Sequence, residues 1–279
     1  MENNKNKEAL LKLFDKISKV ESDNSGYSIG KSTIRKVFDA TQSYSKEDLL
    51  ARLTIIDSMY STQMNRRYYG LEELAEVLYD ISKKKTLSKA FIDFLKEKDF
   101  SLFKISDKDT NLFTEPYGIG KNGEDKGRAV SLISKYAYFE THYQFPIYDS
   151  IVREMYPRIW NYCGFSPEKM LKIKTNDIES FIDAINSLIK ELNHPTVNYD
   201  SLDRVLWYVG KIQRGNLSLI LSRTEYEAFV KKYPQQFKKK EKEETKFIFD
   251  IATVDLETLP LEQKDGIIYD FFVLAKNLK

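Results

Sequence analysis

A lysine and an aspartate near the middle of the chain have the residue types and spacing that could cleave a covalent bond. Lys135 lies in the aromatic, helix-periodic stretch SKYAYF, and Asp149 follows fourteen positions later, after the Phe145-Pro146-Ile147 corner. One helix end and one loop separate them, so the chain can bring them together at a cleft. A lysine desolvated among aromatic rings makes a good amine nucleophile, and an aspartate at a helix N-terminus stays ionised.

Both residues also have a purely structural interpretation, in which Asp149 caps the helix that begins at Ser150 and Lys135 points to solvent. Other chemistries have less support. Cys163 is the only cysteine, which excludes an intramolecular disulfide and a cysteine-based zinc site. His142 and His194 lie in loop-like segments that favour surface or capping roles. We therefore expect no metal and no cofactor.

A second group of chemistry-bearing residues follows the apolar helix predicted over residues 46–60. Ser61-Thr62-Gln63 ends that helix, and a basic-aromatic patch of Arg66, Arg67, Tyr68 and Tyr69 comes next. Adjacent arginines can hold phosphates, while amides and tyrosines can enter or stack in a groove. The alternative is a solvated turn between two helices.

Glycines mark the segment 99–125, which mixes turn residues with short apolar pairs and predicts a loop or a short hairpin. Gly118, Gly120 and Gly123 lie close together before the helix that carries Lys135. Backbone amides of such a hairpin can bind phosphates. The basic residues that would assist them are Lys121, Lys126 and Arg128.

The remaining sequence predicts the helices that would position these residues. Apolar residues recur with helical spacing over 7–20, 46–60, 71–82, 87–98, 128–139, 150–156, 176–192, from 200 or 201 to 209, after Thr224, and over 266–278. Ser45 and Asn176 are the predicted N-caps of two of them. Residues 22–30 predict a loop, and a strand is expected after Lys246. The predicted fold class is all-α, with two helical subdomains flanking a cleft, little β structure and a C-terminal extension.

Length and charge limit the organisation of the chain. Its 279 residues are divided here into a helical domain, 1–223, made of two interleaved subdomains, and an extension, 224–279, that begins with the charged linker 231–246. Lys and Arg number 44 against 42 Asp and Glu, so a nucleic-acid partner needs a local basic face. No run of about 18 apolar residues would span a bilayer. We expect a cytoplasmic monomer without membrane contact.

The order of glycine hairpin, helix, Pro-x-x-Asp loop and helix resembles the helix-hairpin-helix DNA glycosylases. It is most similar to their bacterial 8-oxoguanine glycosylase-like branch, whose SK, F and FPIYDS string is matched by Ser134-Lys135, Phe139 and residues 145–150. Ser61-Thr62-Gln63 resembles the superfamily's Ser-x-Gln element, and residues 202–207 resemble a late helix of that branch. The resemblance covers residues 45–215.

This resemblance implies a base-excision glycosylase that cleaves the N-glycosidic bond of a flipped, damaged or modified base in double-stranded DNA, with or without AP-lyase activity. Lys135 would form a Schiff base, and Asp149 would stabilise the charge on the sugar. Gln63 would fill the space left by the base. The implied pocket walls are Tyr138, Phe139 and Trp207. The iron–sulfur cluster of some relatives needs four cysteines, so it is not expected here.

The chain also departs from the family. The family's Gly-x-Gly hairpin stands directly before its catalytic lysine, whereas residues 121–127 separate Gly118-Ile119-Gly120 from the helix. Lys121 or Lys126 could replace Lys135 as nucleophile, or Asp149 could act without a lysine. Two other functions remain open: a non-catalytic helical module that binds nucleic acid or a protein in defence or regulation, and a degenerate glycosylase fold that recognises modified DNA without cutting it.

Overall fold

The structure is a computed structural model that describes residues 2–19, 26–41, 43–105, 108–125, 127–234, 251–264 and 266–278. Over these residues the secondary structure consists of α-helices, short 3-10 turns and isolated β-bridges, without a strand or a sheet. The predicted all-α fold class is confirmed. The chain forms two compact units: unit 1 contains Met1–Ile29, Ser150–Met170 and Asn186–Lys279, and unit 2 contains Gly30–Asp149 and Leu171–Ile185.

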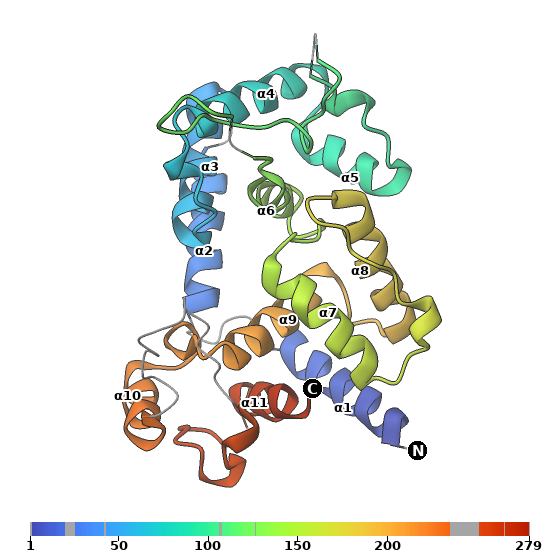
Figure 1. The fold of residues 1–279 in the computed structure, drawn as a ribbon, viewed down its shortest axis with the longest axis vertical. Coiled ribbons are helices and arrows are strands. Elements are labelled where there is room, and N and C mark those ends of the chain that lie inside the picture. Colours follow the sequence, from blue (N-terminus) through green and yellow to red (C-terminus); the bar gives the residue numbers. More distant parts are fainter. Residues whose placement is uncertain are drawn as a thin grey trace. The chain divides into compact units, whose positions relative to one another are not determined.

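Unit 2 is built around helix α6 (Val130–Glu140), which packs against α3 (Lys46–Tyr60) and α5 (Leu87–Glu97) (Figure 1). Helix α4 (Gly70–Lys84) packs against α3 and α5. Most of α2 (Gly26–Ala40) and the first half of α8 (Ile178–Leu192) complete the unit.

Helix α6 is buried on all sides. Every residue from Leu132 to Glu140 is buried, and the helix has no polar stripe, as is typical of a helix inside a core. Its one acidic residue, Glu140, accepts a hydrogen bond from Arg52 of α3 at 2.9 Å and from the Tyr136 hydroxyl at 3.2 Å. The Tyr44 hydroxyl donates to the same carboxylate. Because α6 is enclosed in this way, Lys135 lies in the interior of unit 2.

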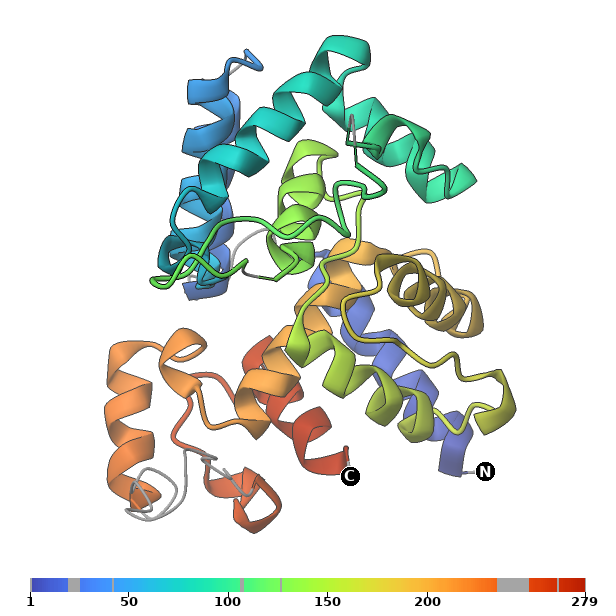
Figure 2. The ribbon, with the colours of Figure 1, turned by 45° about the horizontal axis from the view of Figure 1, so that its top comes forward.

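Unit 1 has helix α9 (Tyr199–Gln213) at its centre, packed against α7 (Ser150–Tyr162) and α11 (Ile267–Asn277) (Figure 2). Helix α1 (Glu2–Ser18) contacts all three. Gly210 permits the close approach of α7, because a Cβ at this position would lie 2.1 Å from the Ile151 side chain. Helix α10 (Arg223–Lys232) follows α9 through a 3-10 turn.

One of the two predicted helix N-caps is confirmed and the other is wrong. Ser45 caps α3 as predicted, accepting a hydrogen bond from the Asp48 amide at 3.1 Å. The predicted cap of α8, Asn176, is replaced by Asp177, whose carboxylate accepts from the Ser180 amide at 2.8 Å. Asn176 instead adopts a left-handed conformation, with φ 54°. Either residue type can cap a helix, so the sequence alone did not separate them.

Two predicted segments change at the ends of the chain. Helix α2 begins at Gly26, so the predicted loop over 22–30 is wrong for its second half, while residues 20–25 lie outside the described part. The strand expected after Lys246 is absent from the described residues 251–264, which form 3-10 turns. Most of the predicted linker, from residue 235, also lies outside the described residues. Helices α10 and α11 lie within unit 1.

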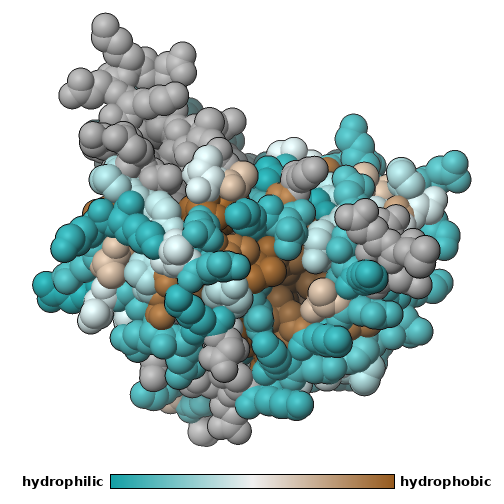
Figure 3. Space-filling view, turned by 90° about the horizontal axis from the view of Figure 1, so that it is seen from below, coloured by the Kyte–Doolittle hydropathy of each residue, from teal (hydrophilic) through white to brown (hydrophobic). Residues whose placement is uncertain are grey.

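On the face seen in Figure 3, hydrophilic residues predominate and hydrophobic residues are visible near its centre. In the described part of the chain, no helix has the length and hydropathy that crossing a bilayer requires.

Candidate functional site

The structure brings Lys135 and Asp149 together. Lys135 Nζ lies 3.3 Å from Asp149 Oδ2 and donates a hydrogen bond to Ser131 Oγ at 2.6 Å. The two partners differ in exposure, since the Lys135 side chain is 1% exposed and the Asp149 side chain 23%. Ser131, in the first turn of α6, is also partly exposed. A molecule approaching the amine would therefore meet Asp149 and Ser131 before it meets Lys135.

The loop that carries Asp149 is fixed by its neighbour Tyr148. The Tyr148 amide donates to Ser134 Oγ on α6 at 2.9 Å, which ties the loop to the helix one residue before Lys135. The Tyr148 hydroxyl accepts from the Asn176 amide at 2.6 Å, and its ring packs edge-on against Phe181 of α8. Both the backbone and the ring of Tyr148 are therefore anchored, which fixes where Asp149 can lie.

This pair has a defined chemical capacity. An ammonium beside a carboxylate can pass a proton to it, and the resulting neutral amine is a nucleophile. The partly exposed carboxylate can stabilise positive charge that develops on a bound molecule. The Tyr60 ring lies 5.3 Å from Lys135 Nζ, within the range of a cation–π contact. Tyr60 is the last residue of α3, so the loop containing Gln63 starts directly after the residue whose ring contacts the amine.

That loop is organised by Asp57, a buried residue near the end of α3 that the sequence analysis did not select. Its carboxylate accepts from the Met64 amide at 2.9 Å and from the Thr62 hydroxyl. Gln63 is exposed and has a left-handed backbone, with φ 64°. Backbone strain of this kind is often found at functional sites. The sequence did offer a sign of this role, because Asp57 is an acidic residue on the apolar face of the helix predicted over residues 46–60.

The basic-aromatic patch and the glycine hairpin form one surface. Tyr68 and Ile119 exchange two backbone hydrogen bonds of 3.0 Å each. Gly118, with φ 76°, lies against Gly70, and the Arg67 guanidinium donates to the Gly127 carbonyl. The exposed side chains on this surface include those of Gln63, Arg66, Tyr68, Tyr69, Lys121 and Arg128, and the hairpin also exposes the acidic residues Glu124 and Asp125. Lys126 lies outside the described residues.

The amides of the hairpin glycines do not form the predicted phosphate site, because each already donates a hydrogen bond to an oxygen of the protein. The Gly118 amide donates to the Glu73 carboxylate at 2.7 Å, and the Gly120 amide donates to the Glu124 carbonyl at 2.8 Å. The Gly123 amide donates to the Gly120 carbonyl at 3.1 Å. A phosphate at this surface would therefore bind to exposed basic side chains and not to these backbone amides.

The predicted base-pocket residues differ in exposure and belong to different units. Tyr138 and Phe139 are fully buried in unit 2, where their rings pack against each other and against Tyr143. They face the core because α6 is enclosed on all sides. Trp207 is partly exposed on α9 in unit 1, with its ring against Tyr208. No aromatic pocket wall can therefore be assigned to Tyr138 or Phe139.

Residues set aside by the sequence analysis have structural roles. Burial raises the pKa of the Cys163 thiol to about 12, which makes it a poor nucleophile. Arg35 Nη1 lies 2.9 Å from His142 Nδ1, and His194 Nδ1 lies 2.9 Å from the Thr196 hydroxyl. Among the described residues, no group of three or more His, Cys, Asp or Glu side chains could hold a metal ion.

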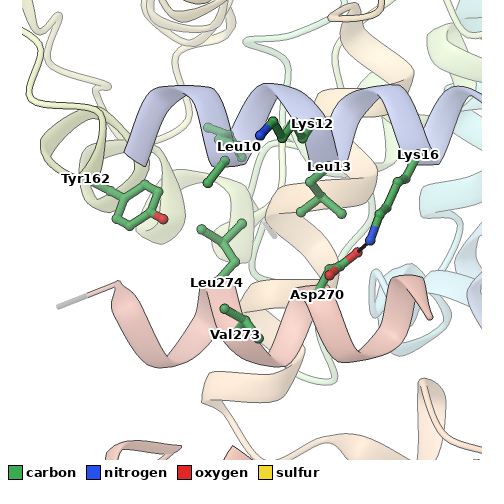
Figure 4. Close-up of a pocket in the computed structure, with 9 residues that line it drawn as sticks. Leu10, Lys12, Leu13, Lys16, Tyr162, Asp270, Val273 and Leu274 are labelled. Atoms are coloured by element: carbon green, nitrogen blue, oxygen red, sulfur yellow. Dashed lines mark hydrogen bonds and ion pairs between the residues drawn. The ribbon is translucent and has the colours of Figure 1, made fainter. Parts of the chain in front are cut away.

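A pocket of about 240 Å³ lies in unit 1 between α1 and α11 (Figure 4). Leucine and valine side chains from the two helices line it, and Tyr162 stands at one end. An ion pair of 2.5 Å between Lys16 and Asp270 lies at the other end. None of the predicted site residues lines this pocket.

Comparison with known proteins identifies no relative. No family model matches the chain, and no curated protein and no solved structure matches it.

Proposed function

We propose that this protein is a DNA glycosylase that cleaves the N-glycosidic bond of a damaged or modified base flipped out of double-stranded DNA. The observation that carries the proposal is the 3.3 Å approach of Lys135 Nζ to Asp149 Oδ2. The two residues belong to the string that resembles the 8-oxoguanine glycosylase-like branch. They are separated by a helix end and a loop, so their proximity depends on the tertiary fold.

The exposure of the pair agrees with a substrate that enters as an extruded nucleotide. Lys135 is too deeply buried to reach a sugar inside a stacked duplex, so the target nucleotide has to leave the stack. Asp149, at the exposed side, would face the deoxyribose and stabilise its developing positive charge. Nζ would pass one proton to Asp149 and attack C1′, and the base would leave with the bonding electrons and take that proton, which returns Asp149 to the carboxylate that stabilises the charge on the sugar.

The surface formed by the patch and the hairpin would hold the DNA around this nucleotide. Gln63 is exposed on the loop that follows Tyr60, whose ring contacts the Lys135 amine, and its side chain would fill the vacated stack. Arg66, Lys121 and Arg128 would contact phosphates, and Tyr68 and Tyr69, 54% and 65% exposed, would stack on bases. Since net charge is only +2, this local surface has to supply the attraction.

The test is a set of duplexes, each carrying one altered base or an abasic site, incubated with the protein and sodium borohydride. We expect one duplex to yield a covalent adduct that Lys135→Ala abolishes. Asp149→Asn should lose base release while binding the same duplex in fluorescence anisotropy. Lys89→Ala is the matched control, because Lys89 is an exposed lysine of α5 that belongs to neither the patch nor the hairpin, and its loss should leave the adduct intact. An adduct that survives in Lys135→Ala and disappears in Lys121→Ala would move the nucleophile to the hairpin.

A second function, a nucleic-acid-binding module without catalysis, is favoured by one observation. The exposed side chains of Gln63, Arg66, Tyr68 and Tyr69 belong to a surface whose backbone pairing does not involve Lys135. Such a module would bind duplex in anisotropy and release no base from any member of the set. Its binding would be unaffected by Lys135→Ala and lost with Arg66→Ala.

A further inference from the structure

We propose that Ser131 is a positioning residue that holds the Lys135 amine in the direction from which it attacks. This inference rests on the proposed function, since the direction of the amine matters only if it reacts. Ser131 occupies the position one helical turn before Lys135, on the same face of α6. The distance of 2.6 Å between Lys135 Nζ and Ser131 Oγ is shorter than the 3.3 Å between Nζ and Asp149 Oδ2.

Two acceptors from different elements hold Nζ. Ser131 belongs to α6, and Asp149 belongs to the loop that Tyr148 anchors to α8. A lysine side chain is a flexible four-carbon stem, so its nitrogen can take several positions while it keeps a hydrogen bond to a single acceptor. With an oxygen on each of two elements, Nζ has one preferred position between helix and loop.

The serine contact becomes more important during the reaction. When Asp149 takes a proton from Nζ, the attraction between the two charges disappears. The neutral amine still has an N–H to donate to Ser131 Oγ, so the nitrogen stays in place while its lone pair forms the bond to C1′ and the glycosidic bond breaks. Without the Ser131 hydroxyl, the Lys135 amine would lose this fixed position. It would then point at C1′ less often, and attack would be slower.

Ser134 provides a comparison on the same helix. Its hydroxyl donates to the Ser131 carbonyl at 3.0 Å and accepts from the Tyr148 amide at 2.9 Å. It therefore supports the loop that carries Asp149. Ser134→Ala removes a hydroxyl from α6 while Ser131 keeps its contact with Nζ, and Ser131→Thr keeps a hydroxyl at the position under test.

The first experiment needs no DNA. In protein with ¹⁵N-labelled lysine, the Lys135 ammonium signal is the one missing from Lys135→Ala. A buried, hydrogen-bonded ammonium exchanges its protons slowly, so the signal should be visible in the unaltered protein, in Ser131→Thr and in Ser134→Ala. It should be broadened or lost in Ser131→Ala. An unchanged Lys135 signal in Ser131→Ala, in a variant whose urea unfolding matches the parent, would overturn the proposal.

The second experiment measures single-turnover borohydride trapping on a duplex with an abasic site. Ser131→Ala should lower the rate at saturating duplex on the order of tenfold while the half-saturating duplex concentration stays the same. Ser131→Thr should recover most of the rate. An equal rate in Ser131→Ala and the parent protein would refute the positioning role. If the NMR signal is lost in Ser131→Ala but no duplex gives an adduct with the parent protein, the Ser131 contact is supported and the glycosylase function fails.

Discussion

At the scale of single residues, Gly118 shows how a missing side chain joins two loops. A Cβ on Gly118 would lie 2.7 Å from the Cβ of Arg67 and 3.0 Å from the Cα of Gly70, so only glycine allows the hairpin to lie against the patch. The left-handed φ of 76° adds a second requirement, since other residues adopt it at a cost. The contact between the hairpin and the patch therefore depends on glycine at position 118.

We expect Gly118→Ala to destabilise the protein more than Gly123→Ala. Gly123 has nearly the same φ, 78°, but a Cβ there has open space around it. Both variants should lose about 1 kcal/mol from the left-handed backbone, and Gly118→Ala should lose about 1–3 kcal/mol more from the clash. Urea unfolding followed by circular dichroism measures both. Equal losses would show that the Gly70 contact is unimportant.

At the scale of elements, α6 depends on the ion pair that anchors its C-terminal end. Arg52 and Glu140 are 5% and 6% exposed and lie 2.9 Å apart. A buried charge that loses its partner is costly, whereas removing both charges is much less so. Glu140→Gln should therefore lower the free energy of unfolding by about 3 kcal/mol.

The control is Glu227→Gln, which breaks the exposed pair between Arg223 and Glu227 and should change stability by less than about 0.5 kcal/mol. The double variant Arg52→Met with Glu140→Leu should be more stable than Glu140→Gln alone. If all three variants unfold at the same urea concentration, the buried pair does not anchor α6.

The sequence predicted these helices correctly where the residues that define them are neighbours along the chain. Ser45 and the acids after it define the start of α3, and apolar spacing located α6. Periodicity did not show whether Lys135 faced inward, because a helix apolar on nearly every side has no stripe to read. Asp57 and the pairing of Tyr68 with Ile119 were missed, since both act on residues brought near by the tertiary fold.

At the scale of the whole molecule, both units contain buried thiol or tyrosine hydroxyl groups, which ionise less readily than they would in water. Burial raises the pKa of Cys163 in unit 1 to about 12 and raises the pKa of Tyr117 and Tyr136 in unit 2 above their usual range. In the unfolded chain a thiol ionises near pH 8.5. The folded state then holds more protons than the unfolded state, so stability is greatest below that pH and is lost as the pH rises.

We expect the free energy of unfolding to fall by about 1 kcal/mol between pH 8.5 and 9.5 on account of Cys163 alone, because the unfolded thiol goes from half to mostly ionised over this interval. Urea titrations at pH 7.5, 8.5 and 9.5 measure this slope. Cys163→Ala should shift the stability at every pH and remove most of the decrease in this interval. The same slope with and without Cys163 would mean that the thiol is not the group responsible.

The hairpin has one further consequence, for engineering. Bridges between Pro116 and Arg128 and between Ile119 and Asp125 fix its stem, whereas residues 121–123 form an exposed tip. Exposed tips accept foreign sequence more readily than paired backbone does. An epitope or a dye-binding peptide inserted at residue 122 would therefore report on this surface from close by, while leaving intact the glycine contact that holds the stem.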